Sequence, residues 1–225
     1  MNGHRDWSRR LKPRLLLLAL SICAAVAVCW SAARLVALRH RAPGMPVVRH
    51  PALDDRDLTP FERAVVRDLS RQERAQIWYH DAYYQGGDPP PDVGVCTDVV
   101  VRAYRAGGVD LHALVAADVR NYPHAYGIAR PDPNIDYRRC RNLVVYFRRH
   151  AAEIASAQDW RPGDVVFWST HRDGRIDHVG VVSNDLDQEG APAVFDHWPG
   201  DYVAEKGCLF AWPIVRHFRM TTAPG

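Results

Sequence analysis

Two segments that lie far apart in the chain most constrain how it can fold. Cys96 opens an apolar, helix-like run in Gly94–Val100, and His178 stands 82 positions later, at the start of the strand-like run His178–Val182. A helix N-terminus favours a thiolate, and a strand holds an imidazole in a fixed orientation. A fold that brings the two together supplies the nucleophile and the general base of a thiol acyl-transfer enzyme.

Each of these residues also has an ordinary structural interpretation. A lone cysteine is commonly a buried core residue, and a histidine at a strand start is commonly a half-buried side chain with its hydrogen bonds satisfied. The apolar strand Pro162–Trp168, which begins Pro-Gly-Asp and ends ten positions before His178, makes the combination more specific than either residue alone. Gly180 lets the histidine's strand approach a neighbour closely. We therefore expect Cys96 to be the nucleophile and His178 its base.

A catalytic imidazole needs a partner that fixes its orientation. Asp196 ends the next predicted strand, 18 positions beyond His178, and a hairpin would place the two side chains next to each other. His197 competes for this role, but strand alternation turns its side chain to the opposite face. Asp98 and Asp177 are further candidates. We expect Asp196 to complete the triad.

The order of the elements predicts an α+β domain with an antiparallel sheet, because helical patterns come first and strand patterns follow from Trp160. Thr59, Pro60 and Glu62 form a capping box that opens the first helix. We expect the helices that carry the cysteine to pack on the sheet that carries the histidine. The predicted helices cover 60–84, 97–104, 111–119 and 142–157, an irregular loop covers 121–142, and the strands cover 164–169, 178–183, 192–197 and 214–219.

The N-terminus has the pattern of a membrane or export signal. Five basic residues precede 15–33, a run of 19 residues without a charge. Such a run is just long enough to span a bilayer, and the positive-inside rule places the rest of the chain outside the cytoplasm. We expect a single-pass inner-membrane anchor, with a cleaved signal as the alternative. The predicted organisation is an anchor or signal over 1–38, a linker over 39–57 and a folded domain over 58–225.

The charge balance argues against nucleic acid as a partner. Residues 1–38 hold six of the 29 basic residues and one of the 26 acidic ones, so the remainder has 23 basic against 25 acidic residues. A domain without a basic surplus lacks the electrostatic footprint of nucleic-acid binding.

Three cysteines follow the apolar run, and an odd number in an oxidising compartment leaves one thiol unpaired. We expect a disulfide between Cys140 and Cys208, with Cys96 as the reactive thiol. A zinc site is the competing interpretation, but the chain has no HExxH or CxxC spacing, so we expect no metal and no cofactor. The candidate ligands of such a site are His171, Asp177, His178, Asp196 and His197, together with Cys96.

These segments resemble a known group of proteins. The order of a cysteine at a helix start, a Pro-Gly-Asp strand and a His-Val-Gly-Val-Val strand is similar to the NlpC-type branch of the papain-like cysteine peptidases. Within it, Gly94–Arg105 and Pro131–Arg139 are similar to the YijF-like exported bacterial proteins, a family of unknown function. The resemblance covers residues 78–219. It implies a papain-like fold with Cys96 as nucleophile and His178 as base.

The resemblance also implies a substrate class, the amide or peptide bonds of cell-wall peptidoglycan. Where relatives often carry a His-Asn pair, this chain has Asp196-His197. Two other outcomes stay open: an acyltransferase or transpeptidase, because an amine or alcohol can also resolve a thioester, and a non-catalytic wall-binding module on the same fold. The residues that we expect to contact the peptidoglycan stem peptide, the arginines through its carboxylates, are Tyr79, Tyr83, Asp98, Arg138 and Arg139.

Overall fold

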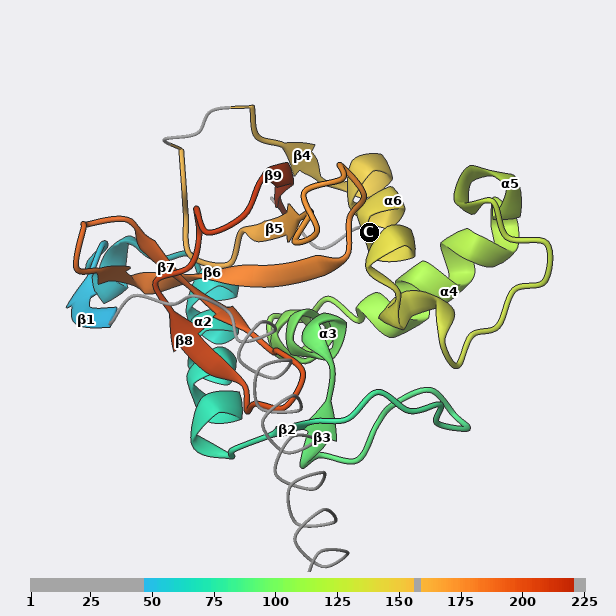
Figure 1. Cartoon of the computed structure of the whole chain (residues 1–225), viewed down its shortest axis with the longest axis horizontal. Helices are drawn as coiled ribbons and strands as arrows, with labels where there is room; N and C mark the ends of the chain where they lie inside the picture. The colour runs from blue at the N-terminus through green and yellow to red at the C-terminus, as the bar shows by residue number, and fades with distance from the viewer. Residues whose placement is uncertain (1–46, 156–158, 221–225) are drawn as a thin grey trace, which may run out of the picture. The chain divides into compact units, whose positions relative to one another are not determined.

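The computed structural model describes residues 47–155 and 159–220, which combine helices with one large sheet (Figure 1). The helices are α2 (Pro60–Arg74), α3 (Cys96–Ala106), α4 (Leu111–Asn121), α5 (Pro123–Tyr126) and α6 (Cys140–His150), with short 3-10 turns η1 (Asp55–Asp57) and η2 (Asp136–Arg138). The strands are β1 (Val47–Pro51), β2 (Trp78–Tyr79), β3 (Val93–Gly94), β4 (Ala152–Glu153), β5 (Val165–Trp168), β6 (His178–Asp187), β7 (Pro192–Asp196), β8 (Ala204–Lys206) and β9 (Ile214–Arg219).

The large sheet has the strand order β4-β9-β5-β6-β7-β8, with β1 paired to β6, and its pairings are antiparallel. β2 and β3 form a separate parallel pair. The predicted antiparallel sheet is confirmed, and β5, β6, β7 and β9 correspond to the four predicted strands. β1 falls in the segment predicted as a linker. Because its backbone pairs with β6, this part of the chain belongs to the sheet.

The first helix begins where the sequence predicts and ends earlier. The Thr59 hydroxyl accepts the Glu62 N–H at 3.2 Å, and the Glu62 carboxylate accepts the Thr59 N–H at 2.7 Å, which completes the capping box. The prediction that this helix continues to near Tyr84 was wrong, because α2 ends at Arg74. Gln76 adopts a left-handed φ of 52°, which stops the helix and turns the chain into β2.

The segment predicted as an irregular loop, 121–142, is partly helical, since it contains α5, η2 and the start of α6. The helix predicted over 142–157 instead covers Cys140–His150. It ends early because the following residues form β4, which pairs with β9.

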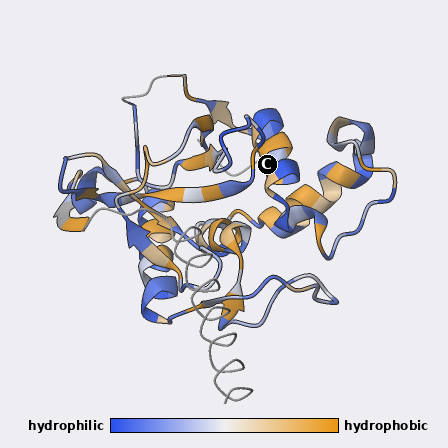
Figure 2. Ribbon diagram, in the orientation of Figure 1, coloured by the Kyte–Doolittle hydropathy of each residue, from blue (hydrophilic) through white to orange (hydrophobic). Residues whose placement is uncertain are grey.

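The central strands are buried on both faces. Val165 and Phe167 of β5 belong to the main core, which the helices share, while Val166 and Trp168 join a second cluster that includes Cys208. α3 packs on β6 and against α2 (Figure 1). Figure 2 shows α3 mostly in hydrophobic colours and α2 mostly in hydrophilic ones. Burial on both faces explains why β5 is a continuous apolar run instead of an alternating one.

Gly180 allows β6 to pack closely against its neighbours, as the sequence predicts. A Cβ atom at this position would lie 2.7 Å from Val194 Cγ1, 2.9 Å from Trp168 Cη2 and 3.0 Å from the Phe195 carbonyl oxygen. These distances are shorter than van der Waals contact, so a side chain at position 180 would displace the residues that surround it.

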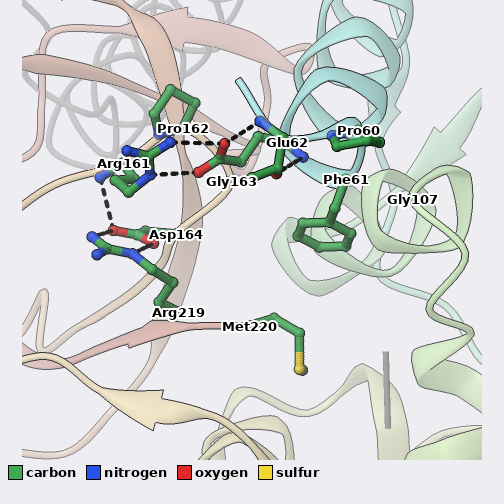
Figure 3. A pocket seen from close by; sticks show the side chains of 11 residues that line it. Pro60, Phe61, Glu62, Gly107, Arg161, Pro162, Gly163, Asp164, Arg219 and Met220 are labelled. Carbon is green, nitrogen blue, oxygen red and sulfur yellow. Dashed lines mark hydrogen bonds and ion pairs between the residues drawn. The ribbon is translucent and has the colours of Figure 1, made fainter. Parts of the chain in front are cut away.

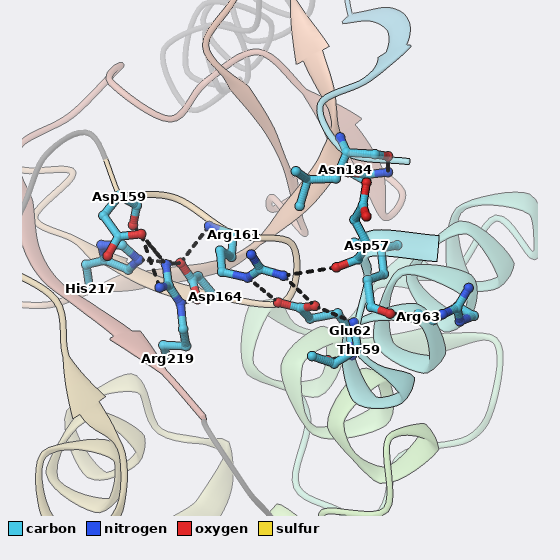
Figure 4. Close-up of polar contacts among 12 residues, drawn as sticks. Asp57, Thr59, Glu62, Arg63, Asp159, Arg161, Asp164, Asn184, His217 and Arg219 are labelled. Atoms are coloured by element: carbon cyan, nitrogen blue, oxygen red, sulfur yellow. Dashed lines mark hydrogen bonds and ion pairs between the residues drawn. The ribbon is translucent and has the colours of Figure 1, made fainter. Parts of the chain in front are cut away.

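The aspartate of the Pro-Gly-Asp segment ties β5 to β9. Asp164 is 1% exposed, and its carboxylate accepts two hydrogen bonds from Arg219, each 2.8 Å long (Figure 4). The Nε2 atom of His217 lies 2.7 Å from the same carboxylate, which also accepts the Arg161 N–H at 2.9 Å. Asp164 therefore fastens the sheet.

In the part of the chain that the structure describes, no helix is long and apolar enough to cross a membrane. The predicted anchor over 1–38 lies outside the described residues.

Candidate active site

A buried ion pair holds the start of α3 in place. Asp98 accepts the Val95 N–H at 2.8 Å and so caps the helical turn that begins with Cys96. Arg138 donates to both oxygens of the Asp98 carboxylate, at 2.9 Å and 2.8 Å, and to the Ala82 carbonyl oxygen at 2.7 Å. The pair therefore links α3 to η2 and to the loop after β2.

This arrangement corrects the role that we predicted for Asp98 and Arg138. Their side chains are 2% and 1% exposed and bind each other, so they are not available to a substrate. The Thr97 hydroxyl donates to the Arg138 carbonyl oxygen at 2.8 Å and adds a second link at the same place. These three residues fix the helix turn that carries Cys96.

The Cys96 thiol lies in a setting that favours its ionised form. It belongs to the first residue of α3, and its Sγ atom lies 3.7 Å from the Sγ atom of Cys140, the first residue of α6. The hydrogen bond from Cys140 is the largest cause that lowers the pKa of Cys96, to about 5; burial opposes it, while His178 and the Val179 backbone add to it. Cys96 is therefore a thiolate at neutral pH.

The predicted contact between His178 and Asp196 is present. His178 opens β6 and Asp196 ends β7, and the Nε2 atom of the imidazole lies 3.2 Å from Asp196 Oδ2. Burial lowers the pKa of His178, but Asp196 and the Cys96 thiolate outweigh it and raise that pKa to about 9. Since Nε2 is engaged with Asp196, Nδ1 is the nitrogen available to Cys96.

Lys206 holds the other oxygen of the same carboxylate. Its Nζ atom lies 2.9 Å from Asp196 Oδ1 and 3.4 Å from Asp201 Oδ2, and its side chain is 13% exposed. Burial raises the pKa of Asp196, but His178 and Lys206 together bring it below its usual value. Asp196, although fully buried, is therefore ionised between a lysine and a histidine.

Three tryptophans surround the imidazole. Trp168 stacks on His178 with ring centroids 5.7 Å apart, and Trp198 meets it edge-on at 4.6 Å. Trp212 lies 6.2 Å from the imidazole and stacks in parallel on Trp198 at 5.1 Å. This apolar wall keeps water away from the pair formed by His178 and Asp196, which strengthens their interaction.

The other predicted substrate residues fall in different places. Tyr79 packs edge-on against His197 at 5.2 Å, and burial, followed by the charge of Cys96, raises the pKa of Tyr79 above its usual value. Tyr83 is 57% exposed, and its hydroxyl lies 3.1 Å from Asp132 Oδ2. Arg139 is exposed and directly precedes α6. Tyr79 thus lies beside the candidate site, whereas Tyr83 engages a loop.

The competing partners for His178 are engaged elsewhere. Asp177 Oδ2 lies 2.6 Å from His171 Nδ1, and Asp98 is bound to Arg138. Burial lowers the pKa of His197 to about 4, so its ring is neutral. For the zinc interpretation, residues 47–155 and 159–220 contain no group of three or more histidine, cysteine or acidic side chains placed to hold a metal ion.

The predicted disulfide between Cys140 and Cys208 is wrong, since Cys96, Cys140 and Cys208 are all free thiols in the structure. Cys140 lies beside Cys96, whereas Cys208 belongs to the second core cluster with its Sγ atom 3.9 Å from Asp196 Oδ2. The two cysteines that we paired therefore occupy different surroundings.

A separate pocket of about 530 Å³ lies between the start of α2 and the segment 161–164 (Figure 3). Its charged groups neutralise each other, because Arg161 binds Glu62 at 2.6 Å and Arg219 binds Asp164 at 2.8 Å (Figure 4). The predicted catalytic residues do not line it. The pocket offers a ligand neither a nucleophile nor an uncompensated charge.

Sequence reasoning missed Lys206 and the position of Cys140. Lys206 is charged and stands in a three-residue strand, and only the register of β8 against β7, which pairs Asp196 with Ala204, brings it to the carboxylate. Cys140 lies in the segment 121–142 that the sequence predicts as an irregular loop, so its place at the start of α6, beside Cys96, is known only from the structure. Pairing the cysteines by count could not find it.

The sequence of this chain matches a known protein family. The chain belongs to the DUF1287 family, described as a domain of unknown function, whose model matches residues 65–220. A similar relative is "Uncharacterized protein YijF" of Escherichia coli (strain K12), 39% identical over 166 residues that make up 68% of this chain and 80% of the relative.

Two solved structures are similar to the described fold at low sequence identity. NlpC2 of Trichomonas vaginalis matches with a TM-score of 0.46 and 17% identity over 75% of this chain and 49% of its own. NlpC1 of the same organism matches with a TM-score of 0.42 and 16% identity over 76% and 48%. The chain spans about half the length of these two proteins.

Proposed function

We propose that this protein is a cysteine hydrolase that cleaves an amide bond through a thioester on Cys96. The observation that carries the proposal is the arrangement of a low-pKa thiol at a helix N-terminus with an imidazole that a buried carboxylate orients. A structural cysteine needs neither a lowered pKa nor a histidine bound to an aspartate. Both features together are the requirements of nucleophilic catalysis.

The residues divide the reaction between them. The Cys96 thiolate attacks the carbonyl carbon, and backbone N–H groups in the first turn of α3 stabilise the oxyanion that forms. The imidazolium of His178 donates its Nδ1 proton to the leaving amine, and the neutral imidazole then takes a proton from the water that hydrolyses the thioester. Cys96 leaves as a thiolate, and the imidazolium is restored.

Asp196 and Lys206 act through the imidazole and do not contact the substrate. Asp196 fixes the orientation of the ring and stabilises its protonated form. Lys206 keeps Asp196 ionised although the carboxylate is fully buried. The two residues are therefore positioning residues.

For the substrate, we propose the stem peptide of peptidoglycan or the amide bond next to it, and for the location the envelope side of the inner membrane. The support is the resemblance of the Cys96, Pro-Gly-Asp and His178 segments to the NlpC-type peptidases and the export pattern of the N-terminus. Tyr79, half-buried beside the thiol, is a candidate for substrate contact.

The test is to incubate the full chain, in detergent, with purified peptidoglycan fragments and to analyse the products by mass spectrometry beside Cys96→Ala and His178→Ala. We expect new fragments from the unchanged protein only, with masses that identify the bond. Products that carry an added amine or alcohol would show a transferase instead. No turnover with an unreactive Cys96 would refute the enzyme and favour a wall-binding module.

A further inference from the structure

Cys140 has no role in the proposed hydrolysis beyond a hydrogen bond, yet its position is unusual. Its Sγ atom lies 3.7 Å from Cys96 Sγ, and the two residues, 44 positions apart, each open a helix. A disulfide needs the two sulfur atoms to approach to about 2.05 Å. The two sulfur atoms therefore need to approach each other by about 1.7 Å. Both are unbonded thiols.

We propose that Cys96 and Cys140 form a reversible disulfide when a peroxide oxidises Cys96, with Cys140 as the resolving thiol. The bond itself needs only the geometry of the two sulfurs. Its consequence, that the hydrolase is switched off and protected from irreversible oxidation, rests on the proposed function.

The reaction proceeds in two balanced steps. The Cys96 thiolate attacks one oxygen of hydrogen peroxide, the O–O bond breaks, hydroxide leaves, and Cys96 becomes a sulfenic acid. The Cys140 sulfur then attacks the Cys96 sulfur, so that an S–S bond forms and the S–O bond breaks, and the proton of Cys140 leaves with the hydroxyl group as water. One thiolate and one thiol thereby lose two electrons in total, and one peroxide becomes one water and one hydroxide ion.

The surroundings of the two thiols fit these different roles. Cys96 is the thiolate of the pair and hence the sulfur that attacks a peroxide first, since oxidation follows thiolate character. The hydrogen bond to Cys96, the largest cause, raises the pKa of Cys140 while Cys96 carries its charge. Oxidation of Cys96 to a neutral sulfenic acid removes that cause. Cys140 is thus held as a thiol until Cys96 is oxidised.

Both sulfurs keep some exposure to solvent, since Cys96 is 8% exposed and Cys140 is half-buried. A small dissolved oxidant such as hydrogen peroxide therefore has a route to the pair. Cys208 lies in another core cluster, beside Asp196, and serves as an internal comparison.

The test treats the full chain with hydrogen peroxide, blocks remaining thiols with N-ethylmaleimide, and maps peptides without reduction by mass spectrometry. We expect a cross-linked peptide pair that contains Cys96 and Cys140, and dithiothreitol should restore at least nine-tenths of the iodoacetamide reactivity of Cys96. The matched variant is Cys140→Ser, which keeps a hydroxyl donor beside Cys96 but cannot form the bond. It should accumulate irreversible sulfinic acid at Cys96.

Three results would overturn the proposal: Cys96 that accumulates as sulfinic acid in the unchanged protein, a cross-link to a cysteine other than Cys140, or Cys96 that peroxide leaves unmodified. Peptide mapping needs no substrate, so this outcome is independent of the peptidoglycan assay. A cross-link without peptidoglycan cleavage would refute the hydrolase and keep the disulfide. Cleavage without a cross-link would do the reverse.

Discussion

Replacement of Lys206 by methionine removes the one positive charge that we place against Asp196 Oδ1, while it keeps an apolar chain of similar length. The two charged atoms lie 2.9 Å apart, and the lysine side chain is 13% exposed. At an effective dielectric constant of about 20, this separation corresponds to an attraction of about 6 kcal/mol. That energy is equivalent to about 4 pKa units at Asp196, and it is an upper bound because burial of the ammonium opposes it.

Without Lys206, we expect the pKa of the buried Asp196 carboxylate to rise toward neutrality. A protonated Asp196 no longer stabilises the imidazolium of His178, and the Cys96 thiolate then loses its cationic neighbour. The acid limb of the pH profile, the range in which the alkylation rate of Cys96 rises with pH, should therefore move to higher pH by at least about one unit. That shift is a quarter of the upper bound of about 4 pKa units at Asp196. The assay is the rate of iodoacetamide alkylation of Cys96, followed by peptide mass spectrometry across the pH range.

Two control variants test whether the effect comes from the charge of Lys206 beside Asp196. Lys206→Arg keeps a cation at the carboxylate and should keep the acid limb in place. Asp201→Asn removes the second, more distant partner of Lys206, which lies 3.4 Å away, and should also leave the limb unchanged. If a Lys206→Met variant that still unfolds cooperatively alkylates with an unchanged pH dependence, Lys206 does not control the charge of Asp196 or the reactivity of Cys96. Lys206 would then only stabilise a buried carboxylate.

Two further predictions concern the stability of the sheet. Gly180→Ala should reduce the free energy of unfolding by about 1–3 kcal/mol in a denaturant titration, because the new Cβ meets Val194 and the backbone of β7; a change below about 0.5 kcal/mol would contradict this. Asp164→Asn should lower the free energy of unfolding by about 3–5 kcal/mol, because it breaks the buried contacts of this carboxylate with Arg219 and His217. Where the variant stays folded, the alkylation rate of Cys96 should not change, and a large loss of that rate would contradict a purely structural Asp164.

The strands and the histidine–aspartate contact were predictable because both depend on local patterns. Alternating and continuous apolar runs mark β5, β6, β7 and β9, and a hairpin between neighbouring strands brings Asp196 to His178. Gly180 was predictable for the same reason, since an uncommon residue in a strand indicates close packing. The end of α2 was not, because the left-handed Gln76 follows no glycine or proline signal.

The residues around the triad depend on contacts that a sequence does not encode locally. Arg138 is a basic residue in a loop-like segment, and only its position beneath α3 makes it the buried partner of Asp98 instead of a substrate ligand. Lys206 and Cys140 reach the site through the register of β8 and the packing of α6. Tertiary placement decides these roles, and composition or spacing does not.

The most direct test of the account is the pH dependence of Cys96 alkylation in the full chain, measured beside His178→Ala and with Cys208 as the internal reference. We predict a half-maximal rate near pH 5, since the folded pKa of Cys96 is lowered to about 5, and a reactive thiolate–imidazolium pair up to about pH 9, where His178 loses its proton. In His178→Ala, the pH of the half-maximal alkylation rate of Cys96 should be higher than in the unchanged protein. A half-maximal rate near the usual thiol pKa of about 8.5 in the unchanged protein would contradict an activated nucleophile.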